Sequence, residues 1–276
     1  MAIIIIHSNA LNFEQSKILE RKFGKLTAVN NHFRAEVETR PDRNSLIELS
    51  QSLELDINIL PDNFDPKAVK LVISDMDSTL ISIECVDEIA DFINVKPQVA
   101  AITEAAMRGE LNFEESLTER VALLKGLDTA ALQHVYDERL TLNPGAEAWI
   151  EGLKEQQIKF ALVSGGFTFF TQRLQERLDI DFTRANTLAT AEHKLTGQVE
   201  GDIVGAQAKA DFLIELCQQM EILMSQTIAV GDGANDLMMM QEAGLSVAYH
   251  AKPAVQEKAD TALNYRGLDA ILDFVA

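Results

Sequence analysis

Short apolar runs and segments with helical periodicity alternate along the chain. In the first 66 residues this pattern predicts strand, helix, a two-stranded hairpin, helix and strand, in the order βαββαβ. The predicted bounds are Ala2 to Ile6, Phe13 to Phe23, Leu26 to Val29 with Phe33 to Glu38, Asn44 to Leu53, and Ile57 to Leu60. The stretch from Pro61 to Pro66 has the composition of a linker. We therefore predict one domain over residues 1–66 and a second over residues 67–276.

The second region has the pattern of a parallel α/β sheet. Apolar runs that end in polar or glycine-rich turns are followed by helical segments, as in βαβ units. The predicted strands are Leu71 to Ser74, Phe160 to Ser164, Thr227 to Val230 and Leu245 to Ala248. Between the first two strands, the segments VDEIADFI, PQVAAITEAAM, FEESLTERVALL and AALQHVYDERL predict four inserted helices at about residues 84–140. The alternating stretch from Asn186 to Val204 predicts a β-hairpin.

Charge and cysteine content narrow the function classes. With 43 acidic and 24 basic residues, the net charge is −19, and the first 66 residues hold ten acids and seven bases. Sequence-independent binding to nucleic acid or to anionic lipid requires clustered Lys and Arg, so we expect neither partner. The five-residue apolar run near the N-terminus is too short for a signal peptide or a membrane span. Two distant cysteines without metal-binding spacing fit a cytoplasmic protein.

Candidate functional residues follow three of the predicted strands. They are Asp75 and Asp77, Ser164-Gly165-Gly166, and Gly231 to Asp236. In open parallel sheets, ligands bind at the carboxyl ends of the strands, so these segments would converge on one crevice. Taken alone, the sequence DMDST is as typical of a calcium loop or a helix cap as it is of a catalytic site. A calcium loop starting at Asp75 would need Gly at position 80 and Glu at position 86, where Leu80 and Val86 stand.

Together, DMDST, SGG, Lys209 and GDGANDLMM resemble the haloacid-dehalogenase-type phosphatases. The resemblance covers residues 68–276, and it is closest to the phosphoserine phosphatases of that superfamily. Their order and spacing are matched by Glu84, Met107, Phe113, Arg120, SGGF and Lys209. The resemblance implies a parallel Rossmann-like sheet with an inserted four-helix cap. It also implies Mg²⁺-dependent hydrolysis of O-phospho-L-serine to serine and phosphate, the last step of serine biosynthesis.

The resemblance gives Asp75 and Asp77 the central chemical roles. Asp75 would attack phosphorus and form an aspartyl-phosphate, while Asp77 would protonate the leaving oxygen and then activate water. Mg²⁺, which prefers oxygen ligands, would lie between Asp75, Asp232 and the backbone carbonyl of Asp77. Ser164, Gly165 and Lys209 would bind the phosphate. Asn235 and Asp236 would orient the metal ligands and Lys209 without binding the metal themselves.

Selectivity for phosphoserine requires groups beyond the phosphate site. Glu84 would pair with the substrate ammonium and Arg120 with its carboxylate, while Met107 and Phe113 would form an apolar wall. An ordinary alternative is that Arg120 pairs with Glu115 or Glu119 on a solvated helix face. Lys209 alone could likewise be a solvated lysine, and Ser164 alone a helix cap. The five histidines show no ligand spacing, and no role is predicted for them.

Two other function classes remain open. One is a phosphotransferase, or a phosphatase for another small phosphate ester; the other is a regulatory binding module without turnover, which the intact pair Asp75 and Asp77 disfavours. The βαββαβ order of residues 1–66 is ferredoxin-like and resembles the amino-acid-binding (ACT-like) domains attached to some family members. Its first loop, Ser8 to Asn12, lacks the glycine common there. Serine binding to this domain is one hypothesis, and a homodimer through its sheet edges is another.

Overall fold

A computed structural model describes residues 2–107 and 110–275. The chain divides into two compact units, each built from segments distant in sequence. The first unit consists of Met1–Ile73, Pro144–Phe160 and Leu213–Ala276, and the second of Ser74–Asn143 and Ala161–Phe212. A compact unit is not the same as an independently folding domain, so the predicted boundary after residue 66 stays a prediction. Within the described residues, no helix combines the length and apolar character that crossing a membrane requires.

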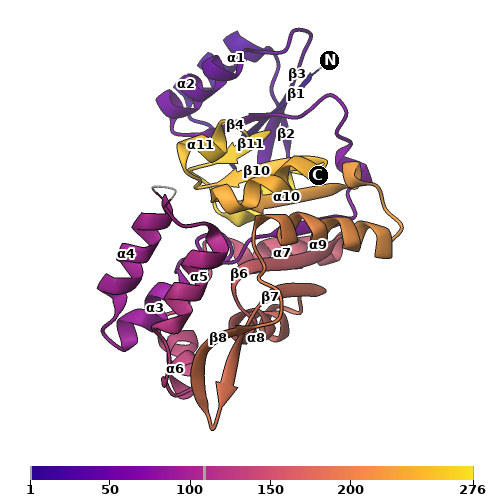
Figure 1. Ribbon diagram of the computed structural model, residues 1–276. Helices are drawn as coiled ribbons and strands as arrows, with labels where there is room; N and C mark the ends of the chain where they lie inside the picture. Colours follow the sequence, from indigo (N-terminus) through magenta and orange to yellow (C-terminus); the bar gives the residue numbers. More distant parts are fainter. Residues whose placement is uncertain (1, 108–109, 276) are drawn as a thin grey trace. The chain divides into compact units, whose positions relative to one another are not determined.

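The N-terminal part of the first unit contains a four-stranded sheet of order β2-β3-β1-β4, in which β1 pairs antiparallel with β3 and β4 (Figure 1). Its elements are β1 (Ala2–His7), α1 (Phe13–Phe23), β2 (Thr27–Val29), β3 (His32–Val37), α2 (Arg43–Leu53) and β4 (Asp56–Ile59). This is the predicted βαββαβ order, with bounds within one residue for most elements. Helix α1 begins where predicted because Asn12 and Gln15 form a reciprocal capping box.

Strand β1 is buried on both faces, which explains its continuous apolar sequence. Ile4 and Ile6 pack with Leu19 of α1 and Leu46 of α2 in one hydrophobic cluster. Successive side chains of a strand point to opposite faces. Ile5 and His7 therefore face away from the two helices, and both are fully buried. This second face contacts the 3₁₀ helix η4 (Leu268–Phe274) near the C-terminus.

The larger sheet has seven strands in the order β11-β10-β9-β5-β6-β7-β8. The pairs β10–β11, β9–β10 and β6–β7 are parallel, and β7–β8 is an antiparallel hairpin. The strands are β5 (Leu71–Ser74), β6 (Lys159–Phe167), β7 (Phe182–Ala191), β8 (Lys194–Glu200), β9 (Thr227–Gly231), β10 (Leu245–Tyr249) and β11 (Thr261–Leu263). The predicted parallel-rich α/β sheet is confirmed.

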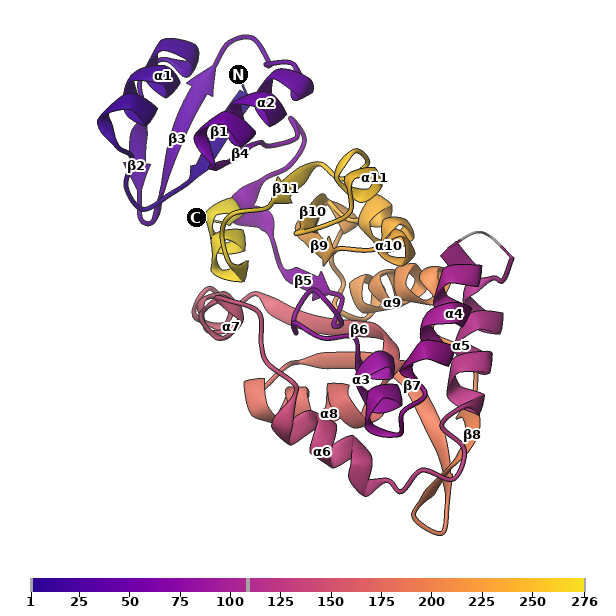
Figure 2. The ribbon, with the colours of Figure 1, turned by 90° about the vertical axis from the view of Figure 1, so that its left-hand side faces the viewer.

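The helices that follow these strands include the four predicted between β5 and β6 (Figure 2). Those four are α3 (Cys85–Phe92), α4 (Lys96–Met107), α5 (Phe113–Ala122) and α6 (Ala130–Glu138). The remaining α-helices are α7 (Ala146–Glu155), α8 (Thr168–Leu178), α9 (Ala206–Gln219), α10 (Leu237–Glu242) and α11 (Pro253–Gln256). In the second unit, α5 packs against β8 and α8 packs against β7.

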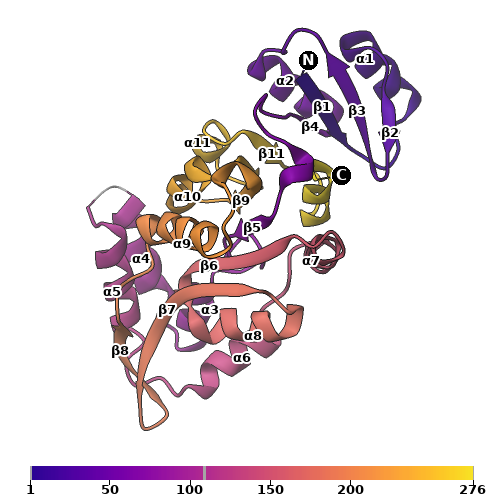
Figure 3. The same cartoon turned by 90° about the vertical axis from the view of Figure 1, so that its right-hand side faces the viewer.

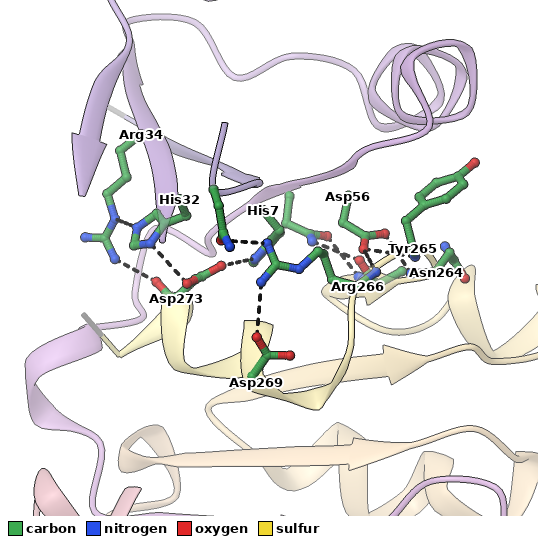
Figure 4. Close-up of polar contacts among 12 residues, drawn as sticks. His7, His32, Arg34, Asp56, Asn264, Tyr265, Arg266, Asp269 and Asp273 are labelled. Atoms are coloured by element: carbon green, nitrogen blue, oxygen red, sulfur yellow. Dashed lines mark hydrogen bonds and ion pairs between the residues drawn. The ribbon is translucent and has the colours of Figure 1, made fainter. Parts of the chain in front are cut away.

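Within the first unit, strand β4 is joined to β11 and the loop after it by two polar side chains. The carboxylate of Asp56 accepts hydrogen bonds from the backbone N–H groups of Asn264, Tyr265 and Arg266, at 2.7, 3.0 and 2.8 Å (Figure 4). The amide of Asn58 donates to the Ala262 carbonyl and accepts from the Ala262 N–H, both at 2.9 Å. The segment from 56 to 58 is therefore hydrogen-bonded to the C-terminal part of the chain.

A buried charged cluster joins β1 and β3 to η4 in the same unit. The carboxylate of Asp273 lies 2.8 Å from Nδ1 of His7 and 3.1 Å from Nδ1 of His32. Arg34 donates to His32 Nε2 at 2.9 Å and to the Asp273 carbonyl at 2.8 Å (Figure 4). Burial raises the pKa of Asp273, but the hydrogen bonds from His32 and His7 and their electrostatic attraction lower it further, to about 2.

Replacing Asp273 by asparagine is expected to lower the free energy of unfolding by about 2 kcal/mol near pH 7. The pKa of this carboxyl is lower in the folded chain than its ordinary value of 3.8. Its contribution is therefore present above that value and is lost as the pH falls from about 4 to about 2. Urea unfolding of wild type and variant between pH 2 and pH 7 measures the difference.

Asp269→Asn is the matched control, because Asp269 lies on the same 3₁₀ helix and pairs with Arg266 in a more exposed setting. We expect that variant to lose under about 1 kcal/mol. On acidification, the difference in free energy of unfolding between wild type and Asp273→Asn should shrink more than that between wild type and Asp269→Asn. If both differences shrink equally, the stability does not come from the histidine contacts of Asp273.

Candidate active site

The segment after β5 holds two carboxylates in fixed positions. All four residues of β5 are buried, and Asp75, directly after it, is 4% exposed. The chain then turns sharply: Ser78 has a φ of +58°, and the N–H groups of Leu80 and Ile81 both bond the Met76 carbonyl. Positive φ is uncommon for residues other than glycine and is frequent at functional sites. The turn keeps Asp77 on the same loop as Asp75.

Lys209 of α9 pairs with Asp75. Its Nζ lies 2.6 Å from Oδ1 of Asp75, and the lysine is only 1% exposed. Removing two charges from water is costly, so a pair this deeply buried needs strong compensation. The alternative that Lys209 is a solvated lysine is therefore wrong.

Asp77 is bound through both carboxylate oxygens. Oδ1 accepts from the Cys85 N–H at 2.8 Å, and Oδ2 accepts from the Ser164 hydroxyl at 3.1 Å. Burial raises the pKa of Asp77 and outweighs the opposing effects of the Cys85 and Ser164 hydrogen bonds and the Lys209 charge. A Cβ atom on Gly166 would lie 2.8 Å from Oδ2 of Asp77, so this position requires glycine. The arrangement favours a protonated carboxyl close to Asp75.

Helix α5 supplies two of the predicted substrate residues. Asn112 and Glu115 form a capping box at 2.9 Å in both directions, which starts the helix at Phe113. The ring of Phe113 reaches the second strand end, since a Cβ on Gly165 would lie 2.8 Å from its Cζ. The Glu115 carboxylate, one of the two acids considered as a surface partner of Arg120, is thus bound to the Asn112 N–H at the start of the helix.

Arg120 lies in an acidic environment in the second unit. It is half-buried, and its Nε donates to the Ser116 carbonyl at 3.2 Å. Burial lowers the pKa of Arg120, while the carboxylates of Asp87, Glu84 and Asp77 raise it. The exposed Glu84 accepts from the Ser78 hydroxyl at 2.7 Å. The structure thus brings Arg120 within electrostatic reach of Glu84 and Asp77. Met107 is the last residue of α4, and its side chain lies outside the described part of the chain.

The GDGAND segment in the first unit follows β9 and folds back over the strand end. Oδ2 of Asp236 accepts from the Gly233 N–H at 2.9 Å. A Cβ on Gly231 would lie 2.5 Å from Asp236, and one on Gly233 would lie 2.2 Å from Oδ1 of Asn235. The buried Asp236 therefore requires glycine at position 231, whereas a side chain at position 233 would require the end of the Asn235 side chain to move.

Three acids at strand ends are of the residue type that binds a metal ion. Asp232 and Asp236 follow β9 in the first unit, and Asp75 directly follows β5 in the second. Hard divalent cations such as Mg²⁺ take oxygen ligands of this kind, so the donor set fits the predicted metal. The sequence predicts the backbone carbonyl of Asp77 as the third metal ligand, and it predicts that Asp236 orients the site without binding the metal. Those assignments stay predictions.

Comparison with known proteins agrees with this arrangement. Residues 69–244 match the family model of the haloacid dehalogenase-like hydrolases. A phosphoserine phosphatase from Polaromonas sp. (strain JS666) is 53% identical over 224 residues, which are 79% of this chain and 95% of that protein. The chain therefore belongs to the haloacid dehalogenase-like hydrolases. It is an enzyme of the phosphatase class.

Solved structures extend the likeness to nearly the whole chain. A HAD family hydrolase from Salmonella enterica serovar Typhi is 35% identical with a TM-score of 0.89, covering 99% of this chain and 98% of that one. A probable phosphoserine phosphatase from Vibrio cholerae is 40% identical with a TM-score of 0.86, covering 99% of this chain and 86% of that one.

Proposed function

We propose that this enzyme hydrolyses O-phospho-L-serine to L-serine and inorganic phosphate with Mg²⁺, as the last step of serine biosynthesis. The observation that carries the proposal is the buried pair of Asp75 and Lys209. Asp77, on the same loop as Asp75, is hydrogen-bonded to Ser164 of β6. An in-line nucleophile, positive charge for the phosphate oxygens and an acid for the leaving oxygen are what phosphoryl transfer requires. The names of the relatives support the choice of phosphoserine.

The proposed chemistry has two steps. A carboxylate oxygen of Asp75 attacks phosphorus, the bond to the seryl oxygen breaks, and the proton of Asp77 goes to that oxygen. Asp77 then takes a proton from a water molecule, which attacks the aspartyl-phosphate and releases inorganic phosphate. The raised pKa of Asp77 supports its first role as an acid. Mg²⁺ would be held by Asp75, Asp232 and the Asp77 carbonyl and would supply positive charge to the phosphate oxygens.

The proposed binding groups fall into two sets. Ser164, Gly165 and Lys209 hold the phosphate, and Asn235 and Asp236 orient the metal site. Glu84 binds the ammonium and Arg120 the carboxylate of the substrate, with Met107 and Phe113 as the apolar wall. In this proposal α3 to α6 form a four-helix cap over the substrate. Glu84 directly precedes α3, Met107 ends α4, and Phe113 and Arg120 lie in α5.

We further propose that residues 1–66 form a ferredoxin-like, ACT-like domain attached to the catalytic domain at 67–276. The sheet order β2-β3-β1-β4 supports that assignment. Serine binding to the domain and a homodimer through its sheet edge stay hypotheses. Cytoplasmic location fits two free, buried cysteines.

A substrate and metal panel tests the function. Purified protein is assayed for phosphate release from phosphoserine, phosphothreonine and p-nitrophenyl phosphate, first as purified, then after EDTA and after excess Mg²⁺. We expect phosphoserine to have the highest kcat/KM, activity to vanish with EDTA, and Mg²⁺ to restore it. Equal rates with all three esters would favour a phosphatase of wider specificity. Activity that survives EDTA would rule out the metal's role.

A further inference from the structure

The segment Ser164-Gly165-Gly166 leaves the ladder between β6 and β7. Strands β6 and β7 are neighbours in the larger sheet (Figure 3). Val163 pairs with Arg184 and Phe167 with Asn186, so the chain makes four steps in β6 against two in β7. A bulge of this kind leaves backbone groups of the longer strand without ladder partners. The Gly165 carbonyl lies in the bulge and accepts its hydrogen bond from the side chain of Asn186, at 2.8 Å.

The other end of the Asn186 amide binds a different segment. Its Oδ1 accepts from the Val204 N–H at 2.8 Å, just before α9 begins. Asn186 is 1% exposed. Its orientation follows from chemistry, since a carbonyl can only accept and a backbone N–H can only donate. A single buried side chain therefore connects the bulge to the segment just before α9. Lys209 lies in the first turn of that helix, where its backbone N–H donates to the Gly205 carbonyl at 3.0 Å.

One aromatic ring contacts both segments that Asn186 connects. A Cβ on Gly165 would lie 2.8 Å from Phe113 Cζ, and one on Gly205 would lie 3.3 Å from Phe113 Cδ1. The two glycines thus lie against the same side chain of α5. A shift of either segment would disturb its packing against this ring as well as its bond to Asn186.

We propose that Asn186 is a positioning residue for phosphate binding: by bonding Gly165 and Val204 it fixes the separation between the Ser164–Gly166 segment and the turn that carries Lys209. The inference rests on the proposed function, in which these groups hold the phosphate. Displacing a binding group by about 1 Å can lower the rate by a factor of about 100. Asn186 itself touches neither Asp75 nor Asp77 in the contacts described.

Asn58 provides a matched control. It is also a buried asparagine, 6% exposed, and its amide donates to one backbone carbonyl and accepts from one N–H. It lies in the first unit on β4 and has no place in the proposed site. Replacing either asparagine by alanine removes two hydrogen bonds of the same kind, so the two variants should lose similar thermal stability.

The experiment combines kinetics with phosphate binding. Asn186→Asp, Asn186→Ala and Asn58→Ala are assayed with phosphoserine and p-nitrophenyl phosphate, and inorganic phosphate is titrated calorimetrically in the presence of Mg²⁺. We expect kcat/KM to fall roughly 10- to 100-fold in the Asn186 variants, equally for both esters, with weaker phosphate binding. Asn58→Ala should keep wild-type kinetics and phosphate affinity in its folded state.

Each other outcome has a defined meaning. Wild-type turnover and phosphate affinity in Asn186→Asp, which keeps the shape and the acceptor but loses the donor to Gly165, would overturn the proposal. A loss confined to phosphoserine would also overturn it, because the phosphate site is common to both esters. If the wild type hydrolyses neither ester, the proposed function fails, and the calorimetric comparison of Asn186→Asp with Asn58→Ala decides the role of Asn186 alone.

Discussion

Asp75→Asn is expected to lower turnover of phosphoserine by roughly 10³-fold or more. An amide is a poor nucleophile toward phosphorus, and it is a weaker metal ligand than a carboxylate. The same change removes the negative charge that lies 2.6 Å from the buried ammonium of Lys209. Breaking a buried pair in this way costs roughly 3–5 kcal/mol of stability. Steady-state kinetics and thermal unfolding measure the two effects separately.

The double variant Asp75→Asn, Lys209→Met separates chemistry from stability. Removing both charges should restore much of the lost stability, because replacing a buried pair by apolar groups is often neutral. It should not restore turnover. Mass spectrometry of acid-quenched wild-type enzyme should show one phosphoryl group on the peptide that contains Asp75. Activity above a few per cent of wild type in Asp75→Asn, with deamidation excluded, would disprove the covalent role.

Arg120→Ala and Glu84→Gln are expected to lower kcat/KM for phosphoserine about 10- to 150-fold each. This loss corresponds to roughly 1.5–3 kcal/mol for a hydrogen bond to a charged group. Neither variant should change turnover of p-nitrophenyl phosphate much, because that ester has no ammonium or carboxylate. Glu84 is one of the carboxylates that act electrostatically on Arg120 in the second unit, and the two residues are therefore tested together.

The ratio of the two losses identifies the role of each residue. A selective loss with phosphoserine means that the residue contacts the amino-acid part. An equal loss with both esters means that it supports the packing of α3 to α6. If Arg120→Ala changes neither rate, Arg120 does not bind the substrate, and another phosphate ester becomes the better substrate hypothesis. Glu119→Gln, on the exposed side of the same helix, serves as the control and should match wild type.

Most helices and strands were predictable because their hydrophobic periodicity is local. Helix α1 has the predicted bounds, and the buried strand β5 was recognised from its apolar run. Strand β11 has only three residues, and the first half of β7 includes the polar Thr183 and Arg184, so neither has a clear apolar pattern.

The site was predictable only where the motif resemblance named its residues. Asp75, Asp77 and Lys209 were recognised in this way, and the structure brings them together. The contact of the Cys85 N–H with Asp77 and the two bonds of Asn186 leave no mark in a single sequence. The histidines show no ligand spacing, so no role is predicted for His7, and its partner Asp273 lies 266 residues away along the chain. Pairings at such separations depend on tertiary structure, which local patterns do not encode.

The contacts of Asp56 with the loop after β11 also bear on the order in which the chain folds. Its three hydrogen-bond donors lie 208 to 210 residues further along the chain. During synthesis, the residues of the N-terminal sheet emerge from the ribosome long before the residues that carry those donors are added to the chain. Until then, Asp56 and His7 stay hydrated, and one face of β1 lacks its cover. The first-made strands therefore complete their packing last, and deletion of the final dozen residues should leave the nascent sheet exposed to aggregation.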